Sequence, residues 1–215
     1  MQKIKGVIFD LDGVLVDTAK YHYLAWKKLA NKLGFDFSEK DNERLKGVSR
    51  MRSLEILLEI GGISTDENQK IKWAEEKNES YVESLKTLDK TALLEGTIDY
   101  LNVLHNQGVK ISLGSASKNA PLILSQTAIQ HRFDAVIDGN CVSKAKPDPE
   151  VFLTAAKALN LSPSDCAVFE DSLAGIQAAK KGGMLAVGVG DKENLPGADF
   201  YVKNLEEAKN ACLFI

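Results

Sequence analysis

The sequence predicts an α/β fold, with a Rossmann-like parallel-sheet core and an inserted all-helical domain. Three observations lead to this prediction. The chain opens on a short apolar run, which is typical of a strand buried on both faces. Helix-period patterns replace it over residues 15–93, and strand and helix patterns alternate from residue 94 onward. Such alternation favours right-handed βαβ units and therefore a parallel sheet.

The first predicted strand contains Ile4, Val7, Ile8 and Phe9, and it ends in the polar turn 10–13. β-Branched runs then disappear, and apolar residues recur at helical spacing. The predicted helices of this stretch cover residues 23–33, 54–61 and 67–88, the first followed by Gly34 and the last preceded by Asp66. We therefore expect residues 15–93 to form a helical insert between two parts of the core, 1–14 and 94–215.

The alternating stretch provides the rest of the sheet. Its predicted strands are 109–113, 135–137, 167–169 and 185–189. Its predicted helices begin at Ser117, at Asp148 as N-cap with Pro149 in the first helical position, and at Ser172. The last of these is expected to end at Gly182 or Gly183.

The composition is that of an ordinary globular chain. Of its 215 residues, 44% are hydrophobic and 27% are charged, which excludes intrinsic disorder. The formal net charge of −3 gives no general attraction for nucleic acid or an anionic membrane surface, so we expect neither partner. No apolar stretch reaches the ~18 residues that a membrane span needs. Cys141, Cys166 and Cys212 lie far apart, so we expect buried, reduced thiols in a cytoplasmic protein.

Polar side chains collect where the predicted sheet would bind a ligand. In parallel α/β sheets, ligands bind beyond the carboxyl ends of the strands. Six side chains lie at these strand ends or at helix starts: Asp10, Asp12, Ser115, Lys146, Glu170 and Asp171. Crowded carboxylates repel one another, and Mg2+ relieves that repulsion while accepting phosphate oxygens. A carboxylate could then act as nucleophile, with a second carboxylate as general acid and base.

Each of these residues also has a structural interpretation. An Asp-x-Asp pair commonly marks a solvated turn, Ser115 could cap a helix, and Lys146 could be a surface lysine. Their occurrence together and in order favours a phosphoryl-transfer site. The chain has no G-x-G-x-x-G after the first strand and no G-x-x-x-x-G-K-[ST], which excludes those nucleotide-binding motifs. Its histidines show no zinc spacing.

These motifs resemble those of the haloacid dehalogenase superfamily of aspartate-nucleophile phosphotransferases, over almost the whole chain. The resemblance implies a Rossmann-like core with a helical cap domain at 15–93. It implies that Asp10 is the nucleophile and Asp12 the general acid and base. One Mg2+ would be held by Asp10, the Asp12 carbonyl, Glu170 and Asp171, and the transferring phosphoryl group by Ser115 and Lys146.

Within the superfamily, the chain is most similar to the β-phosphoglucomutase family. The resemblance lies in three short segments, residues 18–22, 45–50 and 115–119. It implies that Arg50 binds the non-transferring phosphate with Ser117, Lys118 and Asn119. It places Gly47 and Val48 at the sugar, and Thr18, His22 and Lys77 on the cap or hinge side. On composition and position alone, His22 could instead be a capping or surface residue, Lys77 could belong to a charged helix face, and Arg50 could pair with Glu55.

The expected reaction interconverts β-D-glucose 1-phosphate and D-glucose 6-phosphate through an aspartyl phosphate. Glucose 1,6-bisphosphate would be both the intermediate and the priming compound. We expect a monomer whose partner is a small phosphosugar. Two alternatives remain open at this point, namely a phosphatase of the same fold that hydrolyses a small phosphometabolite, and a sensor that binds phosphosugar without turnover.

Overall fold

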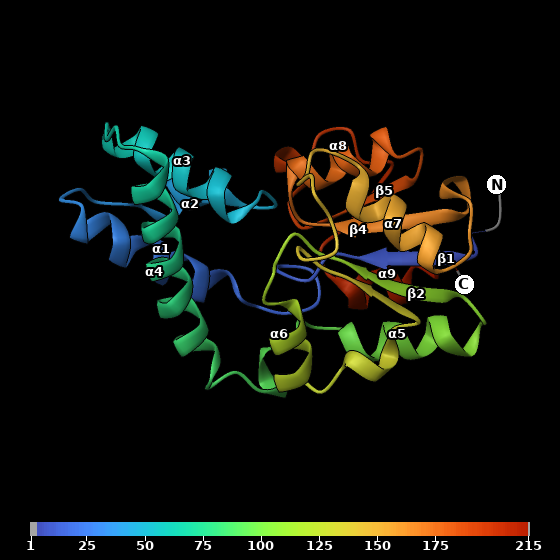
Figure 1. The fold of residues 1–215 in the computed structure, drawn as a ribbon. Coiled ribbons are helices and arrows are strands. Elements are labelled where there is room, and N and C mark those ends of the chain that lie inside the picture. Colours follow the sequence, from blue (N-terminus) through green and yellow to red (C-terminus); the bar gives the residue numbers. More distant parts are fainter. Residues whose placement is uncertain (1–3, 215) are drawn as a thin grey trace.

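The computed structural model describes residues 4–214 as a parallel β-sheet with helices on both faces and a helical layer beside it (Figure 1). Within this range the sheet has six strands in the spatial order β3-β2-β1-β4-β5-β6, and every neighbouring pair is parallel. The strands are β1 Gly6–Phe9, β2 Lys110–Gly114, β3 Ala135–Ile137, β4 Cys166–Glu170, β5 Leu185–Val189 and β6 Phe200–Val202. The predicted α/β fold class is confirmed.

β1 lies in the middle of the sheet, between β2 and β4, and all four of its residues are buried. Val7 lies beside Ile111 of β2 on one side and Ala167 of β4 on the other. The chain builds β2 and β3 on the first side and then crosses to β4, β5 and β6. Ligands bind beyond the strand ends at such a reversal of strand order. The residues that follow β1, β2 and β4 therefore meet at one edge of the sheet.

Alternating side chains of β1 supply both faces of the core. Val7 and Phe9 belong to one buried cluster and Ile8 to another, as the two-residue period of a strand requires. The first face is covered by α5 Thr97–Asn106, α6 Ala120–Gln126 and α9 Leu205–Asn210, and the second by α7 Glu150–Ala158 and α8 Leu173–Lys181 (Figure 1).

The helical layer follows β1 in the sequence. It contains α1 Ala19–Lys32, α2 Glu39–Asn42, α3 Arg50–Gly61 and α4 Glu67–Leu85. Trp26, Leu54 and Ala74 belong to a buried cluster of this layer, separate from the two clusters of the sheet. We propose that residues 15–93 act as one cap domain, because three of their helices share this core.

Several predicted elements differ from the structure at their ends. α6 begins at Ala120 rather than Ser117, because residues 115–119 form a turn held by side chains. α7 has Pro149, not Asp148, in the N-cap position, although the Asp148 carboxylate still accepts a hydrogen bond from the Glu150 N–H at 3.1 Å. The sequence patterns also did not predict α2, α5 or β6.

The prediction of three buried thiols is wrong for two of them. Cys166 is buried in β4, whereas Cys141 and Cys212 are exposed. Cys141 follows β3 in an irregular segment, and Cys212 follows α9, so neither reaches a face of the sheet. Among the described residues, no helix is long and apolar enough to cross a bilayer.

Candidate active site

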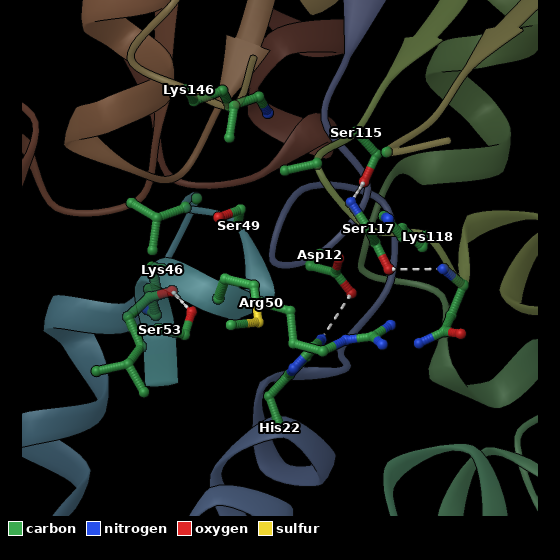
Figure 2. Close-up of a pocket in the computed structure, with 18 of the residues that line it drawn as sticks. Asp12, His22, Lys46, Ser49, Arg50, Ser53, Ser115, Ser117, Lys118 and Lys146 are labelled. Carbon is green, nitrogen blue, oxygen red and sulfur yellow. Dashed lines mark hydrogen bonds and ion pairs between the residues drawn. The ribbon is translucent and has the colours of Figure 1, made fainter. Parts of the chain in front are cut away.

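A cavity of about 440 Å³ lies between the edge of the sheet and the helical layer. Figure 2 shows residues from both sides of it, with Lys46, Ser49 and Arg50 from the cap and Ser115, Ser117 and Lys118 from the core. Thirteen of the predicted site residues line it: Asp10, Asp12, His22, Gly47, Val48, Arg50, Lys77, Ser115, Ser117, Lys118, Asn119, Lys146 and Asp171. Thr18 and Glu170 do not line it, but they hydrogen-bond to residues that do.

A buried ion-pair network forms the core end of the cavity. Asp10 follows β1, Glu170 ends β4, and Lys146 precedes a cis peptide bond to Pro147. The Lys146 Nζ lies 2.6 Å from Asp10 Oδ1 and 2.5 Å from Glu170 Oε1. Burial alone would lower the pKa of Lys146, but the two carboxylates hold it above its ordinary value. The ammonium therefore stays charged beside the proposed nucleophile.

The same end of the cavity contains an excess of negative charge. Burial raises the pKa of Asp10; the Lys146 ammonium opposes this effect, the carboxylates of Glu170 and Asp12 add to it, and the resulting pKa is about 7. Burial, with the charges of Glu170 and Asp10, likewise raises the pKa of Asp171. The Lys146 ammonium pairs with Asp10 and Glu170, whereas Asp171 lies outside that network and 4.0 Å from Lys46. A divalent cation at this point would restore the charge balance.

The donor set fits Mg2+ rather than a softer metal. The candidate ligands are oxygen atoms of carboxylates and of a backbone carbonyl, which hard cations prefer. Within residues 4–214, no three His, Cys, Asp or Glu side chains form a ready-made metal cage. Mg2+ is commonly bound by one or two carboxylates and retains several waters, so it does not need such a cage.

Asp12 lies in the same turn as Asp10 but has the opposite electrostatic environment. Its Oδ1 accepts a hydrogen bond from Thr18 Oγ1 and lies 3.7 Å from His22 Nε2, a contact drawn in Figure 2. Burial alone would raise the pKa of Asp12, but His22 and Thr18 outweigh it and the pKa is lowered. The pKa values of the two carboxylates in this turn are therefore shifted in opposite directions, and a cation bound beside Asp10 would lower the pKa of that carboxyl again.

His22 is held between Asp12 and a buried lysine of α4. The Lys77 Nζ lies 3.1 Å from His22 Nδ1. Because an ammonium group only donates, Nδ1 accepts and the neutral imidazole keeps its proton on Nε2, which faces Asp12. Burial, with the charge of Arg50, lowers the pKa of Lys77 to about 7. His22 and Lys77 are therefore parts of one relay that ends at Asp12, which excludes the surface alternatives for both.

Replacing Lys77 by methionine is expected to stabilise the fold in a pH-dependent way. Between about pH 7 and pH 10 the unfolded chain binds more protons at this lysine than the folded chain, so this group makes stability rise with pH. The gain for Lys77→Met is therefore largest near neutral pH and below, about 1–3 kcal/mol. Urea unfolding at about pH 6 and about pH 10 measures it. Lys72→Met, an exposed position of the same helix, is the control. A gain independent of pH would contradict the assignment.

Residues 115–119 form a tight turn at the end of β2. The Ser115 Oγ accepts from the Ser117 N–H at 3.1 Å, and the Ser117 Oγ accepts from the Asn119 N–H at 3.2 Å. The Lys118 carbonyl accepts from the Asn140 side chain at 3.2 Å. The alternative of Ser115 as a helix cap is wrong, because the N-cap of α6 is Asn119. Ser115 instead shapes this turn and lines the cavity. The turn presents hydroxyl and amine groups to the space opposite the cap.

Arg50 is the first residue of α3 and faces the cavity from the cap. The expected alternative partner Glu55 pairs instead with Arg52, at 2.8 Å. Across the described chain, no carboxylate lies within ion-pair distance of the Arg50 guanidinium. Burial lowers the pKa of Arg50, and the charge of Glu75 opposes this effect. A half-buried guanidinium without a carboxylate partner is well suited to bind a phosphate.

The loop before α3 approaches the core so closely that one of its positions has room only for glycine. Gly47 has φ +71°, and a Cβ at this position would lie 2.0 Å from the Ser172 Oγ. The same loop brings the Lys46 Nζ to 4.0 Å from Asp171 Oδ2 and 2.9 Å from Glu43 Oε2. Sequence reasoning missed Lys46 as a site residue, because its distance to Asp171 depends on how the cap packs on the core. Asn78 was missed for the same reason, and its Oδ1 accepts from Asn119 Nδ2 at 2.9 Å.

Comparison with known proteins identifies the family and relatives of this chain. The sequence profile of the haloacid dehalogenase-like hydrolases matches residues 7–189. The chain is 46% identical over 206 residues to the β-phosphoglucomutase of Bacillus subtilis, covering 95% of this chain and 91% of that protein. It is 32% identical over 184 residues to a phosphorylated carbohydrates phosphatase of Thermotoga maritima, covering 84% and 82%.

A solved structure gives the same result for the fold. The crystal structure of a β-phosphoglucomutase from Clostridium difficile superposes with a TM-score of 0.92 at 43% identity, covering 98% of this chain and 95% of that one. The profile match, the identity and the superposition all extend over most of the chain. The protein therefore belongs to the haloacid dehalogenase-like hydrolase family.

Proposed function

We propose that this protein is a Mg2+-dependent β-phosphoglucomutase that interconverts β-D-glucose 1-phosphate and D-glucose 6-phosphate. The principal observation is a cavity with a cationic side chain at each end, which suits two phosphate groups. Asp10, Ser115 and Lys146 lie at the core end, and the unpaired Arg50 lies on the cap. The relationship to the Bacillus subtilis enzyme supports the same reaction.

In the first half of the reaction, an Asp10 carboxylate oxygen attacks one phosphorus atom of bound glucose 1,6-bisphosphate, and a glucose monophosphate leaves. The bond from phosphorus to the sugar oxygen breaks, and Asp12 donates its proton to that oxygen. In the second half, a sugar hydroxyl attacks the phosphorus of the aspartyl phosphate. Asp12 then takes the hydroxyl proton, and the Asp10 carboxylate is restored. Ser115 and Lys146 stabilise the charge on the phosphoryl group in both directions.

A mutase needs both ends of the hexose to reach Asp10. Glucose 1,6-bisphosphate must therefore turn over between the two half-reactions and also primes the enzyme. The non-transferring phosphate requires a second site that accepts either end. Arg50 supplies a bidentate donor for it, with Ser117, Lys118 and Asn119 on the opposite wall. The cap over the cavity limits access of water to the aspartyl phosphate.

Mg2+ belongs to the same proposal. The carboxylates of Asp10, Glu170 and Asp171 and the carbonyl of Asp12 would hold it, and when bound it neutralises charge on the phosphoryl oxygens. The cap and the core of one chain line the cavity on both sides, so we propose that a monomer suffices for the reaction. Free thiols and a phosphosugar substrate suit the cytoplasm.

The direct test supplies β-glucose 1-phosphate, Mg2+ and a trace of glucose 1,6-bisphosphate, and follows glucose 6-phosphate. The expected result is sustained formation of glucose 6-phosphate that requires both additions. Release of inorganic phosphate without glucose 6-phosphate would overturn the proposal in favour of a phosphatase, the activity named for the Thermotoga maritima relative.

Arg50→Ala tests the second phosphate site. It is expected to lower kcat/KM for β-glucose 1-phosphate by about 10²-fold or more, because the non-transferring phosphate loses a charge-assisted partner. Turnover of acetyl phosphate, which has no second phosphate, should change little. The control is Arg52→Ala, since Arg52 is exposed and engaged with Glu55 and Glu59. Equal losses on both substrates would remove Arg50 from this role.

A further inference from the structure

Tyr81 of α4 lies directly against the relay that ends at Asp12. Its ring stacks on the His22 imidazole, with centroids 4.0 Å apart and planes 30° apart. The Lys77 Nζ lies 4.5 Å from the Tyr81 centroid and 4.6 Å from the Trp26 centroid. Tyr81 therefore contacts both residues of the relay without lining the cavity itself.

The ring of Tyr81, and not its hydroxyl, makes these contacts. The side chain is fully buried, and its hydroxyl has no hydrogen-bond partner in the part of the chain that the structure describes. A buried hydroxyl without a partner destabilises the fold. The contacts with His22 and Lys77 are made by the aromatic face of Tyr81, so we assign its contribution to the shape and charge distribution of that face.

His22 needs such a support because its two nitrogens fix only part of its orientation. Nδ1 contacts Lys77 at 3.1 Å. Nε2 faces Asp12 at 3.7 Å, as Figure 2 shows. Both contacts are made at the edge of the imidazole ring, and neither touches its face. The stacked ring of Tyr81 limits movement of the imidazole perpendicular to its plane. Its negative face also stabilises the Lys77 ammonium that donates to Nδ1.

Tyr81 also belongs to the same buried cluster as the segment that follows Asp12. It belongs to the buried cluster that contains Leu15 and Val16, and not to the core shared by Trp26 and the other cap helices. Leu15 and Val16 are fully buried and lie between Asp12 and Thr18 in the sequence. One side chain thus contacts His22 and Lys77 and belongs to the same buried cluster as Leu15 and Val16, which follow Asp12 in the chain.

We propose that Tyr81 is a positioning residue that acts through His22 to orient the Asp12 carboxylate for proton transfer. This inference rests on the proposed phosphoryl-transfer function. It assigns the effect to the aromatic ring, and it concerns the step in which the sugar oxygen gains or loses a proton.

The test compares Tyr81→Leu, which removes the ring, with Tyr81→Phe, which removes only the hydroxyl. With β-glucose 1-phosphate, Tyr81→Leu is expected to lower kcat by about 10²-fold with little change in KM, since a small misplacement of an acid/base group has an effect of this size. Tyr81→Phe should restore kcat to within about threefold of the parent protein. A loss in Tyr81→Phe as large as in Tyr81→Leu would overturn the assignment to the ring.

Two further measurements separate positioning from a general structural role. Phosphorylation of Asp10 by acetyl phosphate needs no proton at the leaving acetate, so it should survive in Tyr81→Leu. Phe37→Leu removes another fully buried ring, in the separate cap core, and should lower the unfolding temperature without lowering kcat. The proposal fails if Tyr81→Leu loses the acetyl phosphate and sugar phosphate reactions equally, or if its kcat is unchanged.

Failure of the proposed mutase function would give a different result. The parent protein would then release inorganic phosphate instead of forming glucose 6-phosphate. The leaving sugar oxygen would still need a proton, so the same three variants would be compared by phosphate release from β-glucose 1-phosphate. The same outcomes would then support or overturn the role of Tyr81.

Discussion

Asp10→Ala is expected to abolish conversion of β-glucose 1-phosphate, lowering kcat by at least about 10⁴-fold, because no other group is placed to accept the phosphoryl group. Asp10 lies 2.6 Å from the Lys146 ammonium at the core end of the cavity. Incubation with ³²P-labelled glucose 1,6-bisphosphate should label the parent protein and leave the variant unlabelled. Measurable mutase activity or labelling in the variant would contradict the nucleophile assignment.

The same variant decides between an enzyme and a sensor. The Lys146 ammonium retains its contact of 2.5 Å with Glu170 when Asp10 is removed, so the cavity should keep its cationic partner for phosphate. Binding of β-glucose 1-phosphate, followed by calorimetry, should therefore persist in Asp10→Ala. Binding by both proteins, with turnover only in the parent, is the result expected of an enzyme. Binding without turnover in the parent would favour the sensor.

Asp12→Ala is expected to lower kcat with β-glucose 1-phosphate by about 10²–10⁴-fold, the usual contribution of a general acid/base. The backbone carbonyl that would face Mg2+ remains, so the Mg2+ concentration required for half-maximal activity should change little. Phosphorylation of Asp10 by acetyl phosphate should be much less affected, because acetate leaves without a proton. Rapid-quench measurement of both reactions tests this. An unchanged rate with the sugar phosphate would remove Asp12 from proton transfer.

The parts of the fold with local signals could be predicted from the sequence. β1 is an apolar run that ends in a polar turn, and α4 has Asp66 as its N-cap, whose side chain accepts from the Gln69 N–H. The N-cap of α5 is Gly96, which has no side chain to cap the helix, so α5 lacks a start signal. β6 has only three residues, and two of them are partly exposed. Neither segment has a sequence pattern that distinguishes a helix or strand from a loop.

The site, like the fold, has features that a local motif predicts and features that depend on contacts between distant residues. Asp10 and Asp12 share a turn, and their roles follow from the motif that contains them. The opposite shifts of their pKa values depend on Lys146, His22 and Glu170, which come from distant parts of the chain. No sequence pattern reports such contacts. The stacking of Tyr81 on His22 is a further example, because α1 and α4 must pack together before it exists.

The central claim is that the phosphoryl group on Asp10 passes to a sugar hydroxyl and not to water. Time-resolved ³¹P NMR of one reaction, started with β-glucose 1-phosphate, Mg2+ and a trace of glucose 1,6-bisphosphate, measures both fates together. A mutase gives glucose 6-phosphate in large excess over inorganic phosphate, with the bisphosphate maintained. Inorganic phosphate in excess, with the bisphosphate consumed, would contradict the claim and leave Arg50 and the cap without their proposed role in transfer.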